Sequence, residues 1–404
     1  MTTMSTMPSP PAERLSGAQI VVRLLERQGT RIVTGYPGGA ILPIYDALGQ
    51  STIIRHVLAR HEQGAGFIAQ GMARATGEVG VCMASSGPGA TNLLTAIADA
   101  KLDSIPLVAI TGQVPRAMIG TDAFQEVDTY GLSIPITKHN FLVSSAEELL
   151  EVIPRAFEIA ASGRPGPVLI DIPKDVQFAT AEYVPAEKAK VSHYQPRTAG
   201  DPAQIARLVE LMESAERPII YSGGGVINSG TRASQLRREL VAETNFPITS
   251  TLMGLGSYPA SGKNWIGMLG MHGLYEANLA MHGCDVMINI GARFDDRITG
   301  NLGKFSPGSK KIHVDIDPSS INKNVRVDLP IVGDATLVLE EMIKVWKAKQ
   351  PKTDQKDALP VYELSFLFLE NGVSRNLLID YGDFAIQGDL KEIDFFEPAK
   401  CEKK

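Results

Sequence analysis

The feature that most constrains the fold is a repeated pattern: a short apolar run, a turn rich in Gly or Pro, and a longer amphipathic segment. In the first half of the chain this pattern predicts strands at residues 31–34, 53–58, 79–84, 106–110 and 167–172. Segments 18–28, 41–48 and 90–100 carry apolar residues at helical spacing and predict helices. Alternating strands and helices form a parallel sheet covered on both faces. The sequence therefore predicts a doubly wound α/β domain at residues 15–180.

A second series of the same kind predicts a second doubly wound α/β domain at residues 201–347. Its expected strands are residues 218–221, 246–249, 285–290, 311–316 and 330–334, followed by a helix at 337–347. Residues 181–200 lose the pattern and contain Pro185, Pro196 and several lysines, so we expect a linker there. We expect residues 1–14 to be a disordered tail, and residues 348–404 to be a divergent tail with no fold that the pattern supports.

The composition favours a soluble globular protein and excludes several functional classes. The 404 residues are 44% hydrophobic and 21% charged. A net charge of −6 without a Lys/Arg-rich run argues against nucleic-acid binding, and no apolar stretch is long enough to predict a membrane span. Three cysteines without C-x-x-C spacing favour reduced thiols and a cytoplasmic location.

Three Gly-containing segments are expected at the carboxyl ends of strands in the first domain. They are residues 35–39, 86–89 and 112–113. Ligands of open α/β sheets bind at these ends, and glycine lets the backbone approach a ligand closely. Each segment alone is equally well explained as a tight turn, but their expected clustering at one sheet edge favours a ligand site.

The segment RHEQGAG at residues 60–66 provides a candidate acid/base, Glu62. The small residues that follow leave room for a flat ring. A partly desolvated carboxyl at this position could share a proton with a nitrogen base. The alternative is a glutamate that is favoured in a first helical turn by the helix dipole.

Seven motifs in order resemble those of the acetolactate (acetohydroxyacid) synthase catalytic, or large, subunit, a thiamine-diphosphate-dependent family. The resemblance runs from about residue 16 to about residue 347. Each motif alone is weak evidence, but the ordered set is specific. The motifs are GYPGGAILPIYD at 35–46, RHEQGAG at 60–66, SGPGATN at 86–92, TDAFQEVD at 121–128, TKHN at 137–140, GRPGPV at 163–168 and PKDVQ at 173–177.

The resemblance implies that the first domain binds the aminopyrimidine ring of thiamine diphosphate. Glu62 matches the glutamate that hydrogen-bonds the ring nitrogen and so promotes loss of the thiazolium proton. Phe124, Gln125 and Lys174 match residues that line the substrate approach, so the expected catalytic set is Glu62, Gln125 and Lys174. The other expected contacts of this cofactor are Gly38, Gly39, Ser86, Pro88 and Asn92.

The second domain resembles the family's Rossmann-like FAD-binding domain. The triple glycine at 223–225 follows an expected strand, as a dinucleotide loop does, and arginines could meet a pyrophosphate. Arg164 matches an arginine that reaches the flavin from the first domain. In this family the flavin does no net redox work. Within the second domain the expected flavin contacts are Gly223, Gly224, Gly225, Thr251, Leu252, Leu269, Gly270, Met271, His272, Gly291, Ala292, Arg293, Asp295, Arg297, Asp315, Ile316 and Asp334.

The family's third domain, which holds the diphosphate and Mg²⁺ through a Gly-Asp-Gly motif, has no counterpart in the sequence. We therefore expect no metal ligands in this chain, and a truncation or frame change in the gene would explain the break. The resemblance also implies a homo-oligomer whose active site lies between subunits, with a possible small regulatory subunit.

The function that the resemblance implies is decarboxylation of pyruvate, followed by condensation of the two-carbon unit with pyruvate or 2-oxobutyrate. This reaction belongs to branched-chain amino acid biosynthesis, and the single chain is expected to be incomplete for it. The alternatives are another thiamine-diphosphate carboligase or 2-oxoacid decarboxylase, and a non-catalytic FAD-binding or assembly fragment.

Overall fold

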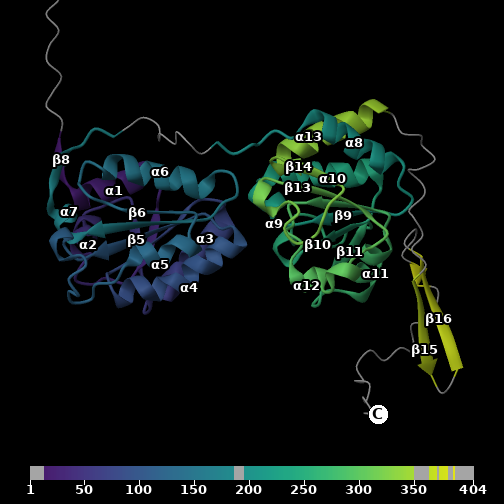
Figure 1. Ribbon diagram of the computed structural model, residues 1–404, viewed down its shortest axis with the longest axis horizontal. Coiled ribbons are helices and arrows are strands. Elements are labelled where there is room, and N and C mark those ends of the chain that lie inside the picture. Colours follow the sequence, from purple (N-terminus) through teal and green to yellow (C-terminus); the bar gives the residue numbers. More distant parts are fainter. Residues whose placement is uncertain (1–12, 186–194, 350–363, 371–372, 381–384, 387–404) are drawn as a thin grey trace, which may run out of the picture. The chain divides into compact units, whose positions relative to one another are not determined.

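The computed structural model describes residues 13–185, 195–349, 364–370, 373–380 and 385–386. The chain divides into two compact units, Met1–Pro196 and Arg197–Lys404. Each unit contains a six-stranded parallel sheet with helices on both faces (Figure 1). The prediction of two doubly wound parallel-sheet domains is therefore confirmed.

The sheet of the first unit has a switch point between its second and third strands in space. The strand order is β3-β2-β4-β5-β7-β6, and every neighbouring pair is parallel. The chain leaves β2 toward one edge and returns past it to β4, and ligands of open α/β sheets bind at such a switch point. The strands are β2 (Ile32–Gly35), β3 (Arg55–Leu58), β4 (Gly80–Ala84), β5 (Leu107–Gln113), β6 (His139–Leu142) and β7 (Pro167–Pro173).

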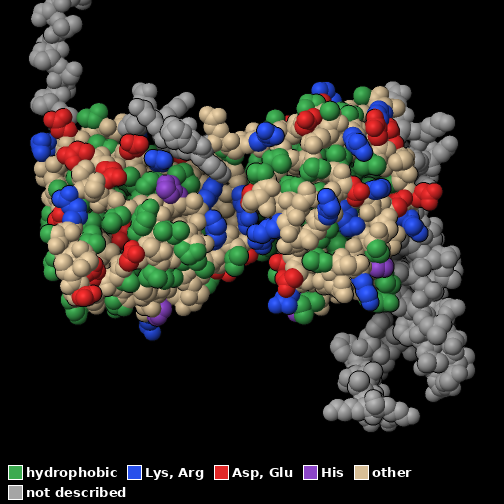
Figure 2. All heavy atoms as spheres, in the orientation of Figure 1, with side chains coloured by type: hydrophobic (Ala, Val, Ile, Leu, Met, Phe, Trp, Pro, Cys, Tyr) green, Lys and Arg blue, Asp and Glu red, His purple; other side chains and the backbone are tan. Residues whose placement is uncertain are grey.

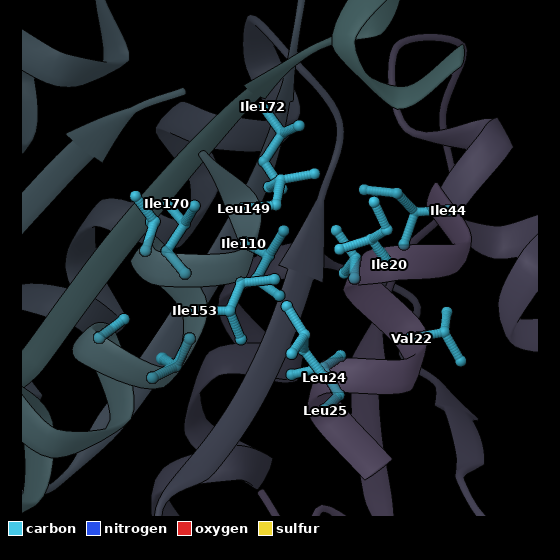
Figure 3. Close-up of a cluster of buried hydrophobic side chains, with 14 of the residues drawn as sticks. Ile20, Val22, Leu24, Leu25, Ile44, Ile110, Leu149, Ile153, Ile170 and Ile172 are labelled. Atoms are coloured by element: carbon cyan, nitrogen blue, oxygen red, sulfur yellow. The ribbon is translucent and has the colours of Figure 1, made fainter. Parts of the chain in front are cut away.

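Two helical layers bury the faces of this sheet. Helices α1 (Gly17–Arg27), α2 (Leu42–Gly49) and α6 (Leu149–Ala161) share one apolar cluster with β5 and β7, where Ile110 and Ile153 meet (Figure 3). Helices α3 (Glu62–Thr76) and α4 (Pro88–Asp103) bury the opposite face in a second cluster. Helix α1 starts at Ser16 because Ser16 and Gln19 form a reciprocal capping box.

The second unit has the strand order β11-β10-β9-β12-β13-β14, all parallel. Two series of three strands wind outward in opposite directions from the boundary between β9 and β12, which is the arrangement of dinucleotide-binding sheets. The strands are β9 (Pro218–Ser222), β10 (Ile248–Ser250), β11 (Trp265–Met268), β12 (Val286–Ile290), β13 (Lys310–Asp315) and β14 (Leu329–Val332).

Four helices cover the second sheet unequally. The larger apolar cluster joins one face to α8 (Pro202–Glu213), α10 (Thr231–Thr244) and α13 (Ala335–Lys349). The smaller cluster joins the other face to α11 (Tyr275–Gly283) and includes Tyr221 and Phe294.

Several elements differ from the sequence-based expectation. Gly112 and Gln113, expected in a loop, lie inside β5. Strand β1 (Arg14–Ser16) pairs antiparallel with β8 (Thr180–Glu182), although Arg14 was expected in the tail and residues 181–182 in the linker. No local pattern marks this pairing, because its partners are more than 160 residues apart. The expected divergent tail contains an antiparallel sheet of β15 (Leu364–Glu370), β16 (Val373–Asp380) and β17 (Ala385–Ile386); the remainder of that tail lies outside the described residues.

Charged side chains of both signs are interspersed with apolar ones on the face of the first unit that Figure 2 shows. Within the described residues, no helix has the length and apolar character needed to span a membrane.

We predict that Ile110→Ala lowers the free energy of unfolding of the first unit by about 2–5 kcal/mol, because its side chain is fully buried between the sheet and α6. Guanidinium unfolding of the full chain measures this change. Ile134→Ala is the matched control, since Ile134 is 58% exposed and its truncation should change stability little. Equal losses in both variants would contradict the assigned core.

Candidate functional site

The loops after β2 and β4 meet at the switch point of the first sheet. The backbone N–H of Ala40 donates to Ser85 Oγ at 3.2 Å. A Cβ added at Gly38 would lie 2.5 Å from Ser85 Cβ, so only glycine allows this approach. Gly39 has open space beside it, with nothing within 4 Å of an added Cβ. Of the two predicted cofactor residues, packing therefore requires a glycine at Gly38 but not at Gly39.

Tyr45 packs against the end of β2. A Cβ at Gly35 would collide with the Tyr45 hydroxyl and would lie 2.6 Å from the Met83 carbonyl oxygen. Burial, with smaller contributions from Cys82 and Glu62, raises the pKa of Tyr45 well above its ordinary value, which favours the neutral phenol.

Glu62 is the first residue of α3, directly after the strand β3 and its turn. His61 caps the helix, because its Nδ1 accepts the backbone N–H of Gln63 at 3.1 Å. Asn92 Nδ2, from α4, donates to Glu62 Oε2 at 2.9 Å. An added Cβ at Gly89 would lie 3.5 Å from Glu62 Oε1, an ordinary van der Waals distance. The half-buried carboxyl is thus held by Asn92 through one of its oxygens.

Segment 120–128 lies against the loop that follows β4. Gln125 has a left-handed backbone (φ 57°), and a Cβ at Gly87 would lie 2.6 Å from its carbonyl oxygen. Gly87 itself has φ 55°. Phe124 beside it is 87% exposed. The structure therefore brings Gln125 next to Gly87. Gly87 follows Ser86 and directly precedes Pro88, the first residue of α4, which also carries Asn92.

Lys174 occupies the same edge of the sheet, further from the switch point. It is half-buried and begins the short helix α7 (Lys174–Phe178), directly after β7. Its placement beyond a carboxyl strand end is shared with Glu62 and Gln125.

Arg164 lies at the opposite edge of the first sheet. It precedes β7, and its Nε donates at 2.8 Å to Ser104 Oγ, which precedes β5. Within the first unit, Arg164 is thus separated from the residues gathered at the carboxyl edge.

In the second unit, three loops pack backbone against backbone at the switch point. The N–H of Gly225 donates to the Gly291 carbonyl at 3.0 Å, and the N–H of Gly223 donates to the Ile290 carbonyl at 2.9 Å. A Cβ at Gly225 would lie 2.7 Å from Gly291 Cα, and one at Gly254 would lie 2.5 Å from the Ser222 carbonyl oxygen. Gly291 also has φ 68°. Glycines at these positions therefore let the three loops pack main chain against main chain.

Every strand of the second sheet contributes predicted residues at its carboxyl end. Gly223 and Gly224 lie beside β9, where α9 (Gly224–Asn228) begins, while Leu252 (69% exposed) and Met271 (63% exposed) project from the loops after β10 and β11. Ala292 is buried, and Arg297 belongs to the short helix α12 (Asp296–Thr299). The remaining predicted residues at this edge are Thr251, Leu269, Gly270, His272, Arg293, Asp295, Ile316 and Asp334.

Two carboxylates at this edge are held by their own loops. Asp315, the last residue of β13, accepts the N–H of Asp317 at 2.8 Å. Asp334 accepts the N–H of Thr336 at 2.9 Å and the Ser229 hydroxyl at 2.7 Å, and so caps α13. These bonds give Asp334 a structural role at the start of α13.

The site includes two residues that the sequence analysis did not single out. They are Ser85, which anchors the loop after β2, and Gly254, which lies against the Ser222 carbonyl oxygen. Gly87 and Gly89 belong to the predicted segment 86–89, but only the three-dimensional contacts show that a side chain at Gly87 would meet the Gln125 backbone. Gly112, predicted as a ligand loop, is instead a packing position, since a Cβ there would lie 2.6 Å from the Ala40 carbonyl oxygen.

The part of the chain that the structure describes has no group of three or more His, Cys, Asp or Glu side chains arranged to hold a metal ion.

Comparison with known families follows the division into two units. Residues 15–132 match the family described as thiamine pyrophosphate enzyme, N-terminal TPP binding domain, and residues 205–342 match the thiamine pyrophosphate enzyme central domain. The chain therefore belongs to the thiamine pyrophosphate enzyme family. Residues 337–397 match an EipB-like family, and the strands β15 to β17 fall within this range.

The similar curated proteins are acetolactate synthase large subunits, as the sequence motifs predicted. The chain is 55% identical over 346 residues to the isozyme 1 large subunit of Escherichia coli, covering 85% of this chain and 60% of that protein. It is 50% identical over 357 residues to a probable large subunit of Methanocaldococcus jannaschii, covering 87% and 60%. For the large subunit of Mycobacterium tuberculosis, the identity is 51% over 331 residues, covering 82% and 53%. The chain thus spans little more than half the length of these relatives.

We predict that Gly225→Ala destabilises the second unit by about 1–3 kcal/mol, because the methyl group would force the Gly291 loop away. Gly283→Ala is the matched control, since it adds the same methyl at a helical position with nothing within 4 Å. Thermal unfolding of the two variants measures the difference. A Gly225→Ala variant as stable as Gly283→Ala would show that the loops do not pack as described.

Proposed function

We propose that the chain provides the pyrimidine-binding and FAD-binding domains of an acetolactate synthase-type enzyme. Its reaction decarboxylates pyruvate and condenses the two-carbon unit with pyruvate or 2-oxobutyrate, in branched-chain amino acid biosynthesis. The observation that carries the proposal is Glu62, held by Asn92 at the start of α3, beyond the carboxyl end of β3. The similarity to acetolactate synthase large subunits supports this choice over other thiamine-diphosphate carboligases.

The first unit fits the aminopyrimidine of thiamine diphosphate in its donor set and in its glycine-lined access. Once bound, this cofactor supplies the electron sink for decarboxylation. Glu62 Oε1 would hold a proton shared with a ring nitrogen, and Asn92 would keep the carboxyl oriented for that exchange. Gly38, Gly39, Ser86 and Pro88 would shape the wall around the ring.

Gln125 and Lys174 would orient the substrate, with Phe124 lining the approach. All three lie beyond carboxyl ends of the first sheet, where open α/β sheets bind ligands. The lysine would attract the carboxylate of a 2-oxoacid, and the amide of Gln125 could donate to a carbonyl oxygen.

The strand order of the second unit fits FAD, because it is the order of dinucleotide-binding sheets. By the resemblance, the loops at Gly223, Gly225 and Gly291 would lie beside the pyrophosphate, and Arg293 and Arg297 could neutralise its charge. Asp315 would hold ribose hydroxyls, in the manner of a carboxylate that follows a strand. We assign Arg164 to the flavin on sequence resemblance alone.

Mg²⁺ and the diphosphate would be held by a third domain outside this sequence, as in the family that the motifs resemble. We therefore propose that the chain acts in a homo-oligomer or beside an intact subunit, with a small regulatory subunit as a further partner. A cytoplasmic location agrees with the buried, unpaired thiols of Cys82 and Cys284.

We predict that this chain restores acetolactate formation to a full-length relative that lacks its own site glutamate. The Escherichia coli isozyme 1 large subunit, with the matching glutamate changed to Gln, would be mixed with this chain, FAD, thiamine diphosphate, Mg²⁺ and pyruvate. Glu62→Gln in this chain should lower the restored rate by about 10²–10⁴-fold, because the proton exchange is lost. Glu78→Gln, at an exposed loop position, should restore as well as the unchanged chain does.

Flavin absorbance of the purified chain provides the second measurement. Bound FAD in both variants, with restoration only by Glu78→Gln, supports the proposal. Bound FAD without restoration by the unchanged chain would favour a non-catalytic flavin-binding or assembly fragment. Restoration by Glu62→Gln would remove Glu62 from the mechanism.

A further inference from the structure

Asp171 is a buried carboxyl to which the proposed mechanism gives no role. It lies in β7, is 1% exposed, and accepts hydrogen bonds from Thr111 Oγ1 at 2.7 Å and from Gln113 Nε2 at 2.9 Å. Both donors belong to the neighbouring strand β5. A buried carboxylate with two donors is satisfied, so structural need alone does not explain why an acid occupies this position rather than an apolar residue.

Gln113 connects this carboxyl to segment 120–128. Its Nε2 also donates to the Val127 carbonyl at 3.0 Å, and its Oε1 accepts the N–H of Val114 at 2.9 Å. The side-chain amide of Gln113 thus bonds to both ends of the segment that leaves β5, at Val114 and at Val127. Directly after Val127, Asp128 caps α5 (Thr129–Ser133) by accepting the N–H of Gly131 at 2.9 Å.

The segment is closed on itself and reaches the proposed site. The Glu126 carboxylate accepts the N–H of Ala123 at 3.1 Å and also that of Gly120. The Gln125 backbone packs on Gly87, in the loop after β4. A displacement of Val127 would therefore move the whole closed segment relative to that loop.

We infer that Asp171, acting through Gln113, is a positioning residue for segment 120–128, which carries Phe124 and Gln125. The inference rests on the proposed function only for the role of those two side chains; the anchoring itself concerns the chain without cofactor or substrate.

The charge of Asp171 changes in an accessible pH range. Burial raises the pKa of Asp171 to about 7, hydrogen bonds from Thr111 and Gln113 oppose the rise, and the charge of Asp128 adds to it. On the neighbouring strand β6, burial and the charge of Arg155 lower the pKa of His139. On α4, the Nζ of Lys101 donates to the Thr137 carbonyl at 2.9 Å. Backbone donors lower the pKa of Glu126, whose titration also lies below this range.

Ionisation should have opposite effects on the unit and on the segment. Because the folded pKa of Asp171 is above its ordinary value of 3.8, its contribution to stability is present below about pH 4 and is lost as the pH rises through about 7. The bond from Gln113 is stronger to a carboxylate than to a neutral acid. Segment 120–128 should therefore become better ordered over the same rise in pH that weakens the unit as a whole.

Hydrogen exchange of the full chain between pH 5.5 and 8.5, corrected for intrinsic rates, tests the inference, together with thermal unfolding at each pH. In the unchanged chain, protection of the Gly120, Ala123 and Glu126 amides should rise about fivefold through pH 7, while the unfolding temperature falls. Gln113→Leu should abolish the rise in protection and keep the fall in unfolding temperature. Asp171→Asn should abolish both.

Thr111→Val is the matched control, because it removes the other hydrogen bond to Asp171 without touching the segment. It should keep the pH-dependent protection. Two results would overturn the inference: loss of that protection in Thr111→Val, or its persistence in Gln113→Leu. The Gln113→Leu result tests the inference even if Asp171→Asn does not fold. Failure of this anchor would leave the proposed function standing, whereas failure of the glutamate complementation would leave the anchor standing.

Discussion

Close contact between backbones at the carboxyl edges of two parallel sheets is the constraint on which both candidate sites depend. In the second unit the loops after β9, β10 and β12 touch through Gly225, Gly254 and Gly291, where no side chain fits. In the first unit Gly38 lies on Ser85 and Gly87 lies on Gln125. A ligand that needs main-chain N–H groups can be approached closely only where such side chains are missing. The glycines therefore allow these loops to pack closely.

Polar side chains behind these loops hold them in place. Ser85 accepts the N–H of Ala40 in the first unit. In the second unit the buried Arg237 donates to Ser222 Oγ at 2.5 Å and lies 5.5 Å from the Tyr258 ring centroid. Burial lowers the pKa of Arg237 to about 10, so it remains charged at neutral pH. Both loops are thus supported by polar contacts.

The predictable part of the fold was the part with strong local signals. Buried runs such as residues 79–84 and 285–290 became the central strands β4 and β12, because central parallel strands are apolar on both faces. Strands β6 and β11 were missed, although the equally short edge strands β3 and β14 were predicted. Gly112 and Gln113 were assigned to a loop because a glycine usually indicates a turn, whereas this one lies within β5. The pairing of β1 with β8 has no local signal at all.

The sequence by itself determined the class of the two domains, their order, and the presence of Glu62, Gln125, Lys174 and the glycine loops, because periodicity and motif order are local properties of the chain. Only the tertiary structure decided which of these residues meet. It placed Asn92 on Glu62 and Gln125 on Gly87, and it separated Arg164 from them at the opposite edge of the sheet. It also linked Asp171 to segment 120–128 through Gln113. The physical reason is that strand order and crossover direction, which no local pattern encodes, fix which loops share a sheet edge.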